Sequence, residues 1–427
     1  MFRRYPATMM RQSTGKLVVD VFTRGPNRTL SPVPGATVVV RERSNGTRQR
    51  QPVEALTTND SGKTEEITLS APPVELTQEP PQEQPYATYD IEIQAPGYTT
   101  LLIEGTQIFA DTTAIQNVTL EPPGEMERQL NEIFIQPHTL WGSYPAKIPE
   151  DPIKPEPPPT GFIVLDEPVI PQYVIVHDGV PDDPNAPNYW VTFKDYVKNV
   201  ASSEIFPTWP ANTIRANVLA ILSFTLNRVF TEWYRGKGKD FTITSSTAYD
   251  HAFFYGRNIY DSVSTIVDEI FVNYIKRPGY RQPLLTQYCD GVKVECPTWM
   301  TQWGSKNLGD QGLDAISILR SFYGQDIYLD TAVRVSGVPA SFPGYNLTIG
   351  SSGAPVRTIQ EQLNAISNSF PAIPKVRVDG NYGQQTADAV KKFQEVFNMP
   401  VNGIVDQPTW YRISDIYVGV TRLAELV

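Results

Sequence analysis

Short apolar segments that alternate with polar positions dominate the first third of the chain. They are separated by turn-prone stretches rich in Gly, Pro, Asn and Asp. Strands at this spacing with polar turns favour a small all-β sandwich over residues 15–124. This segment contains no acid pair or nucleophile constellation, so we predict a folded, non-catalytic domain. The strand-like segments are 17–22, 36–43, 57–69, 87–105 and 113–122.

The segment 125–171 predicts a linker. Its last part, residues 144–171, has nine prolines in 28 residues, which disfavours helix and central strand alike. Such a chain favours extended polyproline II structure with exposed backbone, where proteases cut. Two interpretations stay open, a stiff spacer and an activation site that makes the β-domain a pro-domain.

Apolar positions change to helical spacing in residues 172–335, which predicts a mixed α/β domain. A strand at 173–179 is followed by a helix at 193–204. A buried core helix is predicted at 211–236, an amphipathic helix at 257–276 and another helix at 313–324 that ends at Gly324.

The last segment, 340–427, contains an internal repeat. DGNYGQQT (379–386) and NGIVDQPT (402–409) share the spacing of Gly and Thr. We expect each unit to be a tight loop whose Thr caps the following helix.

The bulk composition excludes several classes of protein. A formal net charge of −10 argues against a nucleic-acid partner, because affinity for phosphates needs basic residues. The sequence contains no run of 18 apolar residues, so it predicts no membrane-spanning helix. Residues 1–14 are a basic presequence without the apolar region of a secretory signal. Cys289 and Cys296 are too few for a disulfide framework and fit no standard metal spacing, so we expect no metal and no cofactor.

The repeat closely resembles peptidoglycan-binding domain 1. That module's D-G-x-[FY]-G-x-x-T-x-x-A-V-x-x-F-Q pattern is preceded by G-x-x-G-x-x-V-x-x-L-Q-x-x-L. It is present almost in full, which implies a three-helix domain and a peptidoglycan ligand. The central motif residues are Asp379, Gly380, Tyr382, Gly383 and Thr386.

The segment YVKNVASSE, followed by WPANTIRANVLA, is similar to the stage II sporulation protein D family of lytic transglycosylases. On this resemblance Glu204 is the catalytic acid. From the residues alone, Glu204 has a second interpretation, an acid that stabilises the N-terminus of the next helix. Leu222 stands where the family has a helix arginine, and ECPT replaces its GHGV, so substrate contacts made there must come from elsewhere.

The order of all segments resembles the SleC family of spore cortex-lytic enzymes, and the β-domain resembles carboxypeptidase regulatory-like, transthyretin-like modules. The resemblance implies an inactive precursor in the endospore cortex or coat region. It also implies activation by a subtilisin-like Csp protease near Ile163–Val164, and cortex peptidoglycan containing muramic-δ-lactam as the substrate.

A lytic transglycosylase needs one carboxylic acid, because the muramic 6-hydroxyl replaces the attacking water. A single acid among apolar neighbours suits a pKa raised toward neutrality. Asp250 is the competing acid. Two other functions stay open, a catalytically silent binding or spore-assembly protein and a muramidase with a second acid. The residues expected to line the glycan cleft are Ser246, Thr247, Asp250, Tyr255, Tyr288, Asp290, Gln302 and Trp303.

Overall fold

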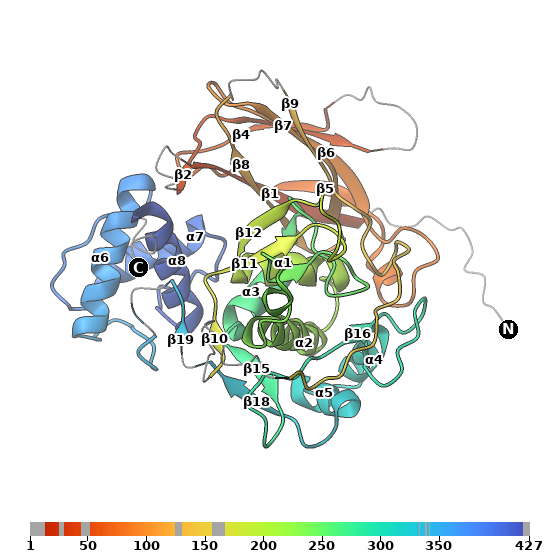
Figure 1. The fold of residues 1–427 in the computed structure, drawn as a ribbon. Helices are drawn as coiled ribbons and strands as arrows, with labels where there is room; N and C mark the ends of the chain where they lie inside the picture. The colour runs from red at the N-terminus through yellow and green to blue at the C-terminus, as the bar shows by residue number, and fades with distance from the viewer. Residues whose placement is uncertain are drawn as a thin grey trace.

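A computed structural model describes residues 13–24, 30–43, 52–123, 130–155, 167–332, 334–337, 340 and 342–421. The predicted cleavage position Ile163–Val164 and most of the presequence lie outside these residues. The described chain is mixed α/β. Two β-sheets lie at one side of a central helical domain, and a C-terminal group of helices lies beside both (Figure 1).

Each of the two sheets has five strands, and their facing sides share one apolar core. Side chains alternate between buried and partly exposed along β6, which is why Tyr89, Ile91 and Ile93 point inward. The first sheet contains β1 (Ser13–Arg24), β2 (Leu30–Pro32), β5 (Ile67–Ala71) and β8 (Thr113–Leu120), with a fifth strand from the central domain. The second has the order β4 (Glu54–Thr57), β3 (Thr37–Glu42), β6 (Ala87–Gln94), β7 (Thr100–Ile108) and β9 (Leu130–Phe134).

The fifth strand of the first sheet is β14 (Ile259–Tyr260), which pairs with β8. Asn258, just before it, accepts the backbone N–H of Gln107 at 3.1 Å and donates to the Gln107 carbonyl at 3.1 Å. The N-terminal sheets and the central domain are therefore joined through continuous backbone pairing.

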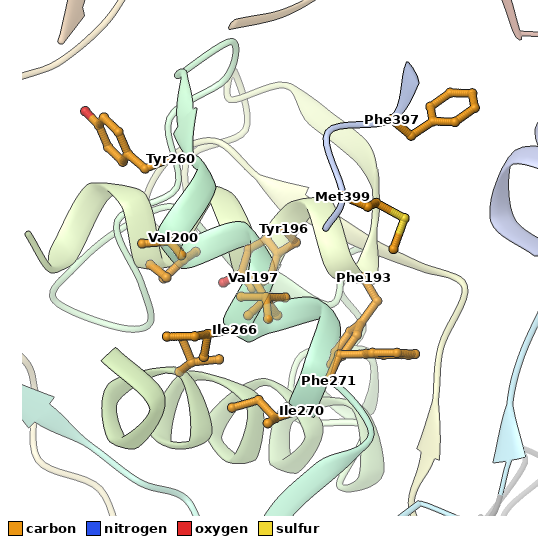
Figure 2. Packing of buried hydrophobic residues seen from close by; sticks show 14 of the residues in the cluster. Phe193, Tyr196, Val197, Val200, Tyr260, Ile266, Ile270, Phe271, Phe397 and Met399 are labelled. Carbon is orange, nitrogen blue, oxygen red and sulfur yellow. The ribbon is translucent and has the colours of Figure 1, made fainter. Parts of the chain in front are cut away.

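The central domain is built around α2 (Ala211–Phe230), whose side chains are buried almost all round. α1 (Phe193–Glu204) and α3 (Asp261–Ile270) pack against it through Tyr196, Val197, Val200 and Ile266 (Figure 2). α4 (Gln302–Asp310) and α5 (Ala315–Tyr323) cover another side, and α5 ends at Gly324 as predicted.

Short strands and two 3-10 helices complete the described part of the chain. The strand pairs are β10 (Val169–Ile170) with β19 (Arg334–Val335), β11 (Tyr173–His177) with β12 (Asn188–Thr192) and β13 (Ile243–Thr244), β15 (Asn273–Lys276) with β18 (Tyr328–Thr331), and β16 (Tyr288–Cys289) with β17 (Met300–Thr301). The 3-10 helices are η1 (Val74–Thr77) and η2 (Arg235–Lys237).

Two helix predictions were too long. The 257–276 segment is helical only in α3, because strands β14 and β15 at its ends pair with partners distant in sequence. α2 ends at Phe230 rather than at residue 236, and Glu232 then takes a positive φ of 48°.

The C-terminal domain consists of α6 (Ala354–Ser369), α7 (Gln384–Val396) and α8 (Gln407–Thr421). In the first repeat unit, Gln360 of α6 accepts the N–H groups of Asp379 and Gly380 and donates to the Thr386 hydroxyl. Gln394 of α7 makes the matching bonds to residues 402, 403 and 409 in the second unit. The expected helix-capping role of the repeat threonines was wrong, because Thr386 and Thr409 lie inside α7 and α8 and no side chain caps α7. Their hydroxyls accept hydrogen bonds from these glutamines.

Candidate active site

Glu204 is the last residue of α1, and its side chain turns into the interior of the central domain, where it is 4% exposed. One carboxylate oxygen accepts the backbone N–H of Ala252 at 2.6 Å, and the other accepts the hydroxyl of Tyr288. The side-chain amide of Gln302 donates to the Glu204 carbonyl at 2.9 Å. Three segments far apart in sequence therefore hold this acid.

The helix-capping interpretation of Glu204 was wrong. α2 begins at Ala211, its N-cap residue is Pro210, and no side chain caps it. The bonds of Glu204 run instead to Ala252 and Tyr288, away from the start of α2.

Burial raises the pKa of the Glu204 carboxyl above its ordinary value, as a general acid requires. The positive charge of Lys147 is the largest opposing effect, and the hydrogen bonds from Ala252 and Tyr288 also favour the ionised form. Burial likewise raises the pKa of Tyr288 well above its usual range, so its hydroxyl keeps the proton that it donates to Glu204.

Glu204 lies in the wall of a pocket together with four other predicted cleft residues. The strand β16 and the loop after it supply Tyr288 and Asp290. Asp290 accepts the backbone N–H groups of Val292, Lys293 and Val294, so its carboxylate shapes this loop. The residues that line the pocket are Thr139, Gly142, Tyr144, Pro145, Lys147, Glu204, Thr247, Tyr288, Cys289, Asp290, Lys293, Val294 and Gln302.

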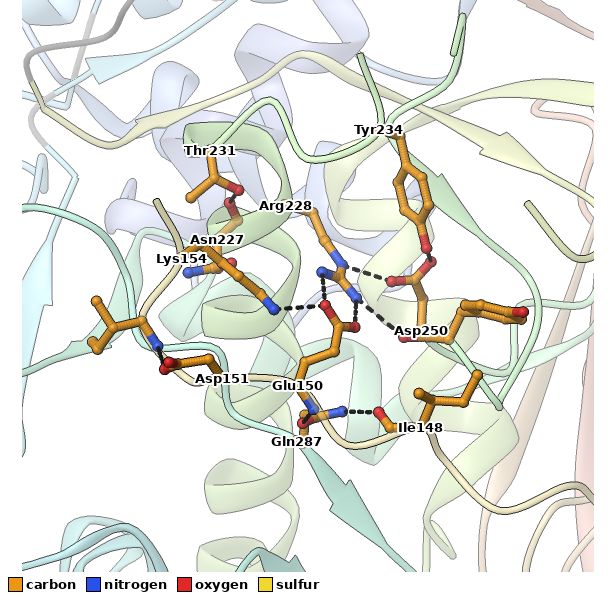
Figure 3. Close-up of polar contacts among 12 residues, drawn as sticks. Ile148, Glu150, Asp151, Lys154, Asn227, Arg228, Thr231, Tyr234, Asp250 and Gln287 are labelled. Carbon is orange, nitrogen blue, oxygen red and sulfur yellow. Dashed lines mark hydrogen bonds and ion pairs between the residues drawn. The ribbon is translucent and has the colours of Figure 1, made fainter. Parts of the chain in front are cut away.

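Asp250, the competing acid, is fully buried in a different environment (Figure 3). One carboxylate oxygen is 2.7 Å from Nε of Arg228, and the other accepts hydrogen bonds from the Tyr234 hydroxyl and from Thr244. All of these contacts are hydrogen bonds or ion pairs that Asp250 accepts within the folded chain, which suits a structural anchor better than a proton donor to substrate.

The remaining predicted residues lie apart from the pocket wall. The Ser246 carbonyl closes the turn before Asp250. Trp303 packs its ring against Phe206 and Trp209, behind Glu204. Tyr255 is 48% exposed and stacks on Tyr189 in a second, open pocket at the edge of β9.

The sequence reasoning missed the contribution of residues 137–155, which we call the strap. Thr139, Gly142, Tyr144, Pro145 and Lys147 of this segment line the pocket, although they precede Glu204 by more than 50 residues. The high proline content of this region predicts a stiff, extended backbone. It does not indicate which other residues of the folded chain the segment contacts.

The two cysteines form a disulfide between Cys289 and Cys296. It closes the loop that carries Asp290 and follows Tyr288 directly. Among the described residues no group of His, Cys, Asp or Glu is arranged to hold a metal ion. Within the same ranges no helix has the length and apolar character needed to cross a membrane.

Parts of the chain resemble solved structures. The SleB N-terminal domain is 27% identical over 18% of this chain and 99% of its own length, with a TM-score of 0.16. The minor pilin GBS52 of Streptococcus agalactiae is 14% identical over 27% of this chain and 48% of its own, with a TM-score of 0.17. Catechol 1,2-dioxygenase of Acinetobacter radioresistens is 17% identical over 29% of this chain and 58% of its own, with a TM-score of 0.18. No curated protein sequence matches the chain significantly.

The family described as "Putative peptidoglycan binding domain" matches residues 352–413. This range covers α6, α7 and about the first half of α8, and it includes both glutamine-clamped loops. The match supports peptidoglycan as a binding partner. The chain therefore carries a C-terminal peptidoglycan-binding domain beside a buried glutamic acid whose pKa is raised by burial.

Proposed function

We propose that the chain is the precursor of a peptidoglycan lytic transglycosylase that acts on the spore cortex during germination. The observation that carries this proposal is the environment of Glu204: a single acid with a raised pKa, held by two donors in a pocket wall. The peptidoglycan-binding domain in the same chain supplies the substrate class.

In the proposed reaction, protonated Glu204 donates its proton to the oxygen that links N-acetylmuramic acid to N-acetylglucosamine, and the glycosidic bond breaks. The resulting carboxylate then accepts the proton of the muramic 6-hydroxyl while that oxygen bonds to C1. The product is a 1,6-anhydro ring and no water is consumed. The Ala252 N–H and the Tyr288 hydroxyl stabilise the carboxylate between these two steps.

The precursor would be activated by cleavage near Ile163–Val164 by a subtilisin-like Csp protease, and the substrate would be glycan containing muramic-δ-lactam. Both statements rest on the resemblance to the SleC family, as does the location in the endospore cortex or coat region.

A muramidase-type hydrolase is the second candidate, because Asp290 places another carboxylate in the same pocket. Its oxygens already accept three backbone N–H groups, which argues for a structural role. A silent peptidoglycan-binding or spore-assembly protein is the third.

Mass spectrometry of products from purified cortex peptidoglycan separates these functions. Protein cleaved in the 156–166 segment should release anhydro-muropeptides, and the Glu204→Gln variant should release none. Reducing-end products would establish the hydrolase instead. If neither protein gives any product, the chain binds peptidoglycan without cutting it.

A further inference from the structure

The strap, residues 137–155, lies along the cleft side of the central domain. Its first part crosses the end of α1, where the Thr139 N–H donates to the Ser203 carbonyl at 3.0 Å. Further on, the Ile148 N–H donates to the Ala248 carbonyl at 2.7 Å, and Gln287 binds the strap backbone on both sides of Pro149. The strap therefore spans the space between the two segments that hold Glu204.

Lys147 is placed at the centre of this crossing. Its ammonium group donates to the Asp250 carbonyl and lies 4.7 Å from the ring centre of Tyr288. It is also 4.9 Å from the ring centre of Phe224. Asp250 immediately precedes the 251–252 segment that binds one oxygen of Glu204, and Tyr288 binds the other. Lys147 thus lies between the two segments whose groups bind the Glu204 carboxylate.

Glu150 anchors the strap three residues further on. Its carboxylate binds both terminal nitrogens of Arg228, at 2.5 and 3.1 Å, and Lys154 lies 2.6 Å from it (Figure 3). The Arg228 side chain is fully buried between Glu150 and Asp250. Such a forked, desolvated contact is strong, because losing one partner leaves a buried charge uncompensated.

The disulfide-closed loop after Tyr288 holds the strap from the other direction. The Lys293 ammonium donates to the carbonyls of Trp141 and Gly142. The strap is consequently held on both sides of Lys147. Lys293 binds it on the N-terminal side, and Arg228 binds it on the C-terminal side.

We propose that the strap is an intramolecular inhibitor that fills the substrate cleft in the full-length chain, with Lys147 over the catalytic acid and Glu150 as its main anchor. This inference rests on the proposed function and names its regulation. A general acid has to lie within hydrogen-bond reach of the glycosidic oxygen. The strap occupies that approach, so glycan and strap exclude one another.

The strap also acts on the charge state of the acid. The positive charge of Lys147 favours the ionised form of Glu204, which has no proton to give. When the strap leaves, this charge leaves with it. Cleavage between the strap and the central domain would therefore remove a steric block and an electrostatic one together, once the released segment dissociates.

The test uses full-length, uncleaved protein carrying Lys147→Met together with Glu150→Gln, which keeps side-chain size and removes both charges. The matched control is Asp151→Asn, an exposed neighbour whose carboxylate binds only the backbone of Ile153 among the described contacts. Release of anhydro-muropeptides from purified cortex peptidoglycan is measured beside hydrogen–deuterium exchange of residues 246–256. A Glu204→Gln version of the double variant identifies the source of any activity.

We expect the double variant to release product at least about tenfold faster than wild type, since breaking a buried ion pair shifts the equilibrium by this order or more. Exchange at 246–256 should accelerate with it, and Asp151→Asn should match wild type. Lys293→Met, which leaves the buried ion pair intact, should give a smaller rise in both measurements.

The two readouts separate the inhibitor from the enzyme. Equal exchange in wild type and double variant would overturn the inhibitory strap, as would equal product release by active proteins. Faster exchange with no product from these variants, nor from protein cleaved in the 156–166 segment, would support the masking strap and reject the transglycosylase.

Discussion

Asp20 provides a test of how the N-terminal sheets and the C-terminal domain hold together. It lies in β1 and is 4% exposed, and the Asn398 side chain of the C-terminal domain donates to it at 2.6 Å. Asn398 in turn accepts a hydrogen bond from Lys63. The second carboxyl oxygen of Asp20 is buried without a hydrogen-bond partner among the described residues.

Burial raises the pKa of Asp20 from 3.8 to about 6, against the charges of Lys63 and Arg412 and the Asn398 bond. The folded state therefore retains a proton that the unfolded chain loses between these two values. The contribution of Asp20 to stability falls as the pH rises from about 4 to about 6 and is constant above that range. At about 1.4 kcal/mol per pH unit, the full loss is about 3 kcal/mol.

Asp20→Asn removes this titration, and urea unfolding followed by circular dichroism measures the result. Relative to wild type, the variant should gain about 2 kcal/mol in free energy of unfolding between about pH 4.5 and about pH 7.5. The exposed Asp60→Asn serves as the control. If the difference between wild type and Asp20→Asn stays the same at both pH values, the buried carboxyl at this interface does not titrate as reasoned.

Three further changes test other contacts. Gln394→Ala should destabilise the C-terminal domain by about 2 kcal/mol in thermal unfolding, because it leaves two loop N–H groups without an acceptor; an unchanged melting temperature would contradict the clamp. Arg228→Met should cost about 3 kcal/mol in urea unfolding by leaving Asp250 buried and uncompensated, whereas a neutral effect would contradict the stabilising role of this ion pair. Replacing Cys289 and Cys296 by Ser should cost about 2.5 kcal/mol, from the entropy of an eight-residue loop; reduced and oxidised wild type should differ by the same amount in urea.

The local spacing of apolar residues was sufficient to predict several of the helices. The helix at 193–204 was predicted at its observed bounds, and the helix predicted at 313–324 spans Ala315–Tyr323 with Gly324 as its C-cap. Apolar spacing and a terminal glycine act within a few residues, so the local sequence suffices for them. The 257–276 segment was wrong at both ends for the opposite reason. Ile259 and Tyr274 belong to strands whose partners, Ile115 and Asp330, are far away in the chain.

The sequence likewise predicted some features of the candidate site and not others. The sequence picked out Glu204 and placed Tyr288 near the cleft, and apolar neighbours indicated the raised pKa. It also named Asp250 as a competing acid, whereas the structure buries Asp250 against Arg228. Nothing in the local sequence distinguishes these two carboxylates, because their donors come from other segments.

The sequence by itself determined the segment order, the amphipathic elements and the glutamine–glycine–threonine repeat that the peptidoglycan-binding family matches. These depend on periodicity and on short-range hydrogen bonding. Only the tertiary structure decided that β14 completes the first sheet, that Cys289 pairs with Cys296, and that the proline-rich strap lies over Glu204. Such contacts are fixed by burial and charge pairing across the folded chain, and a one-dimensional pattern carries no record of them.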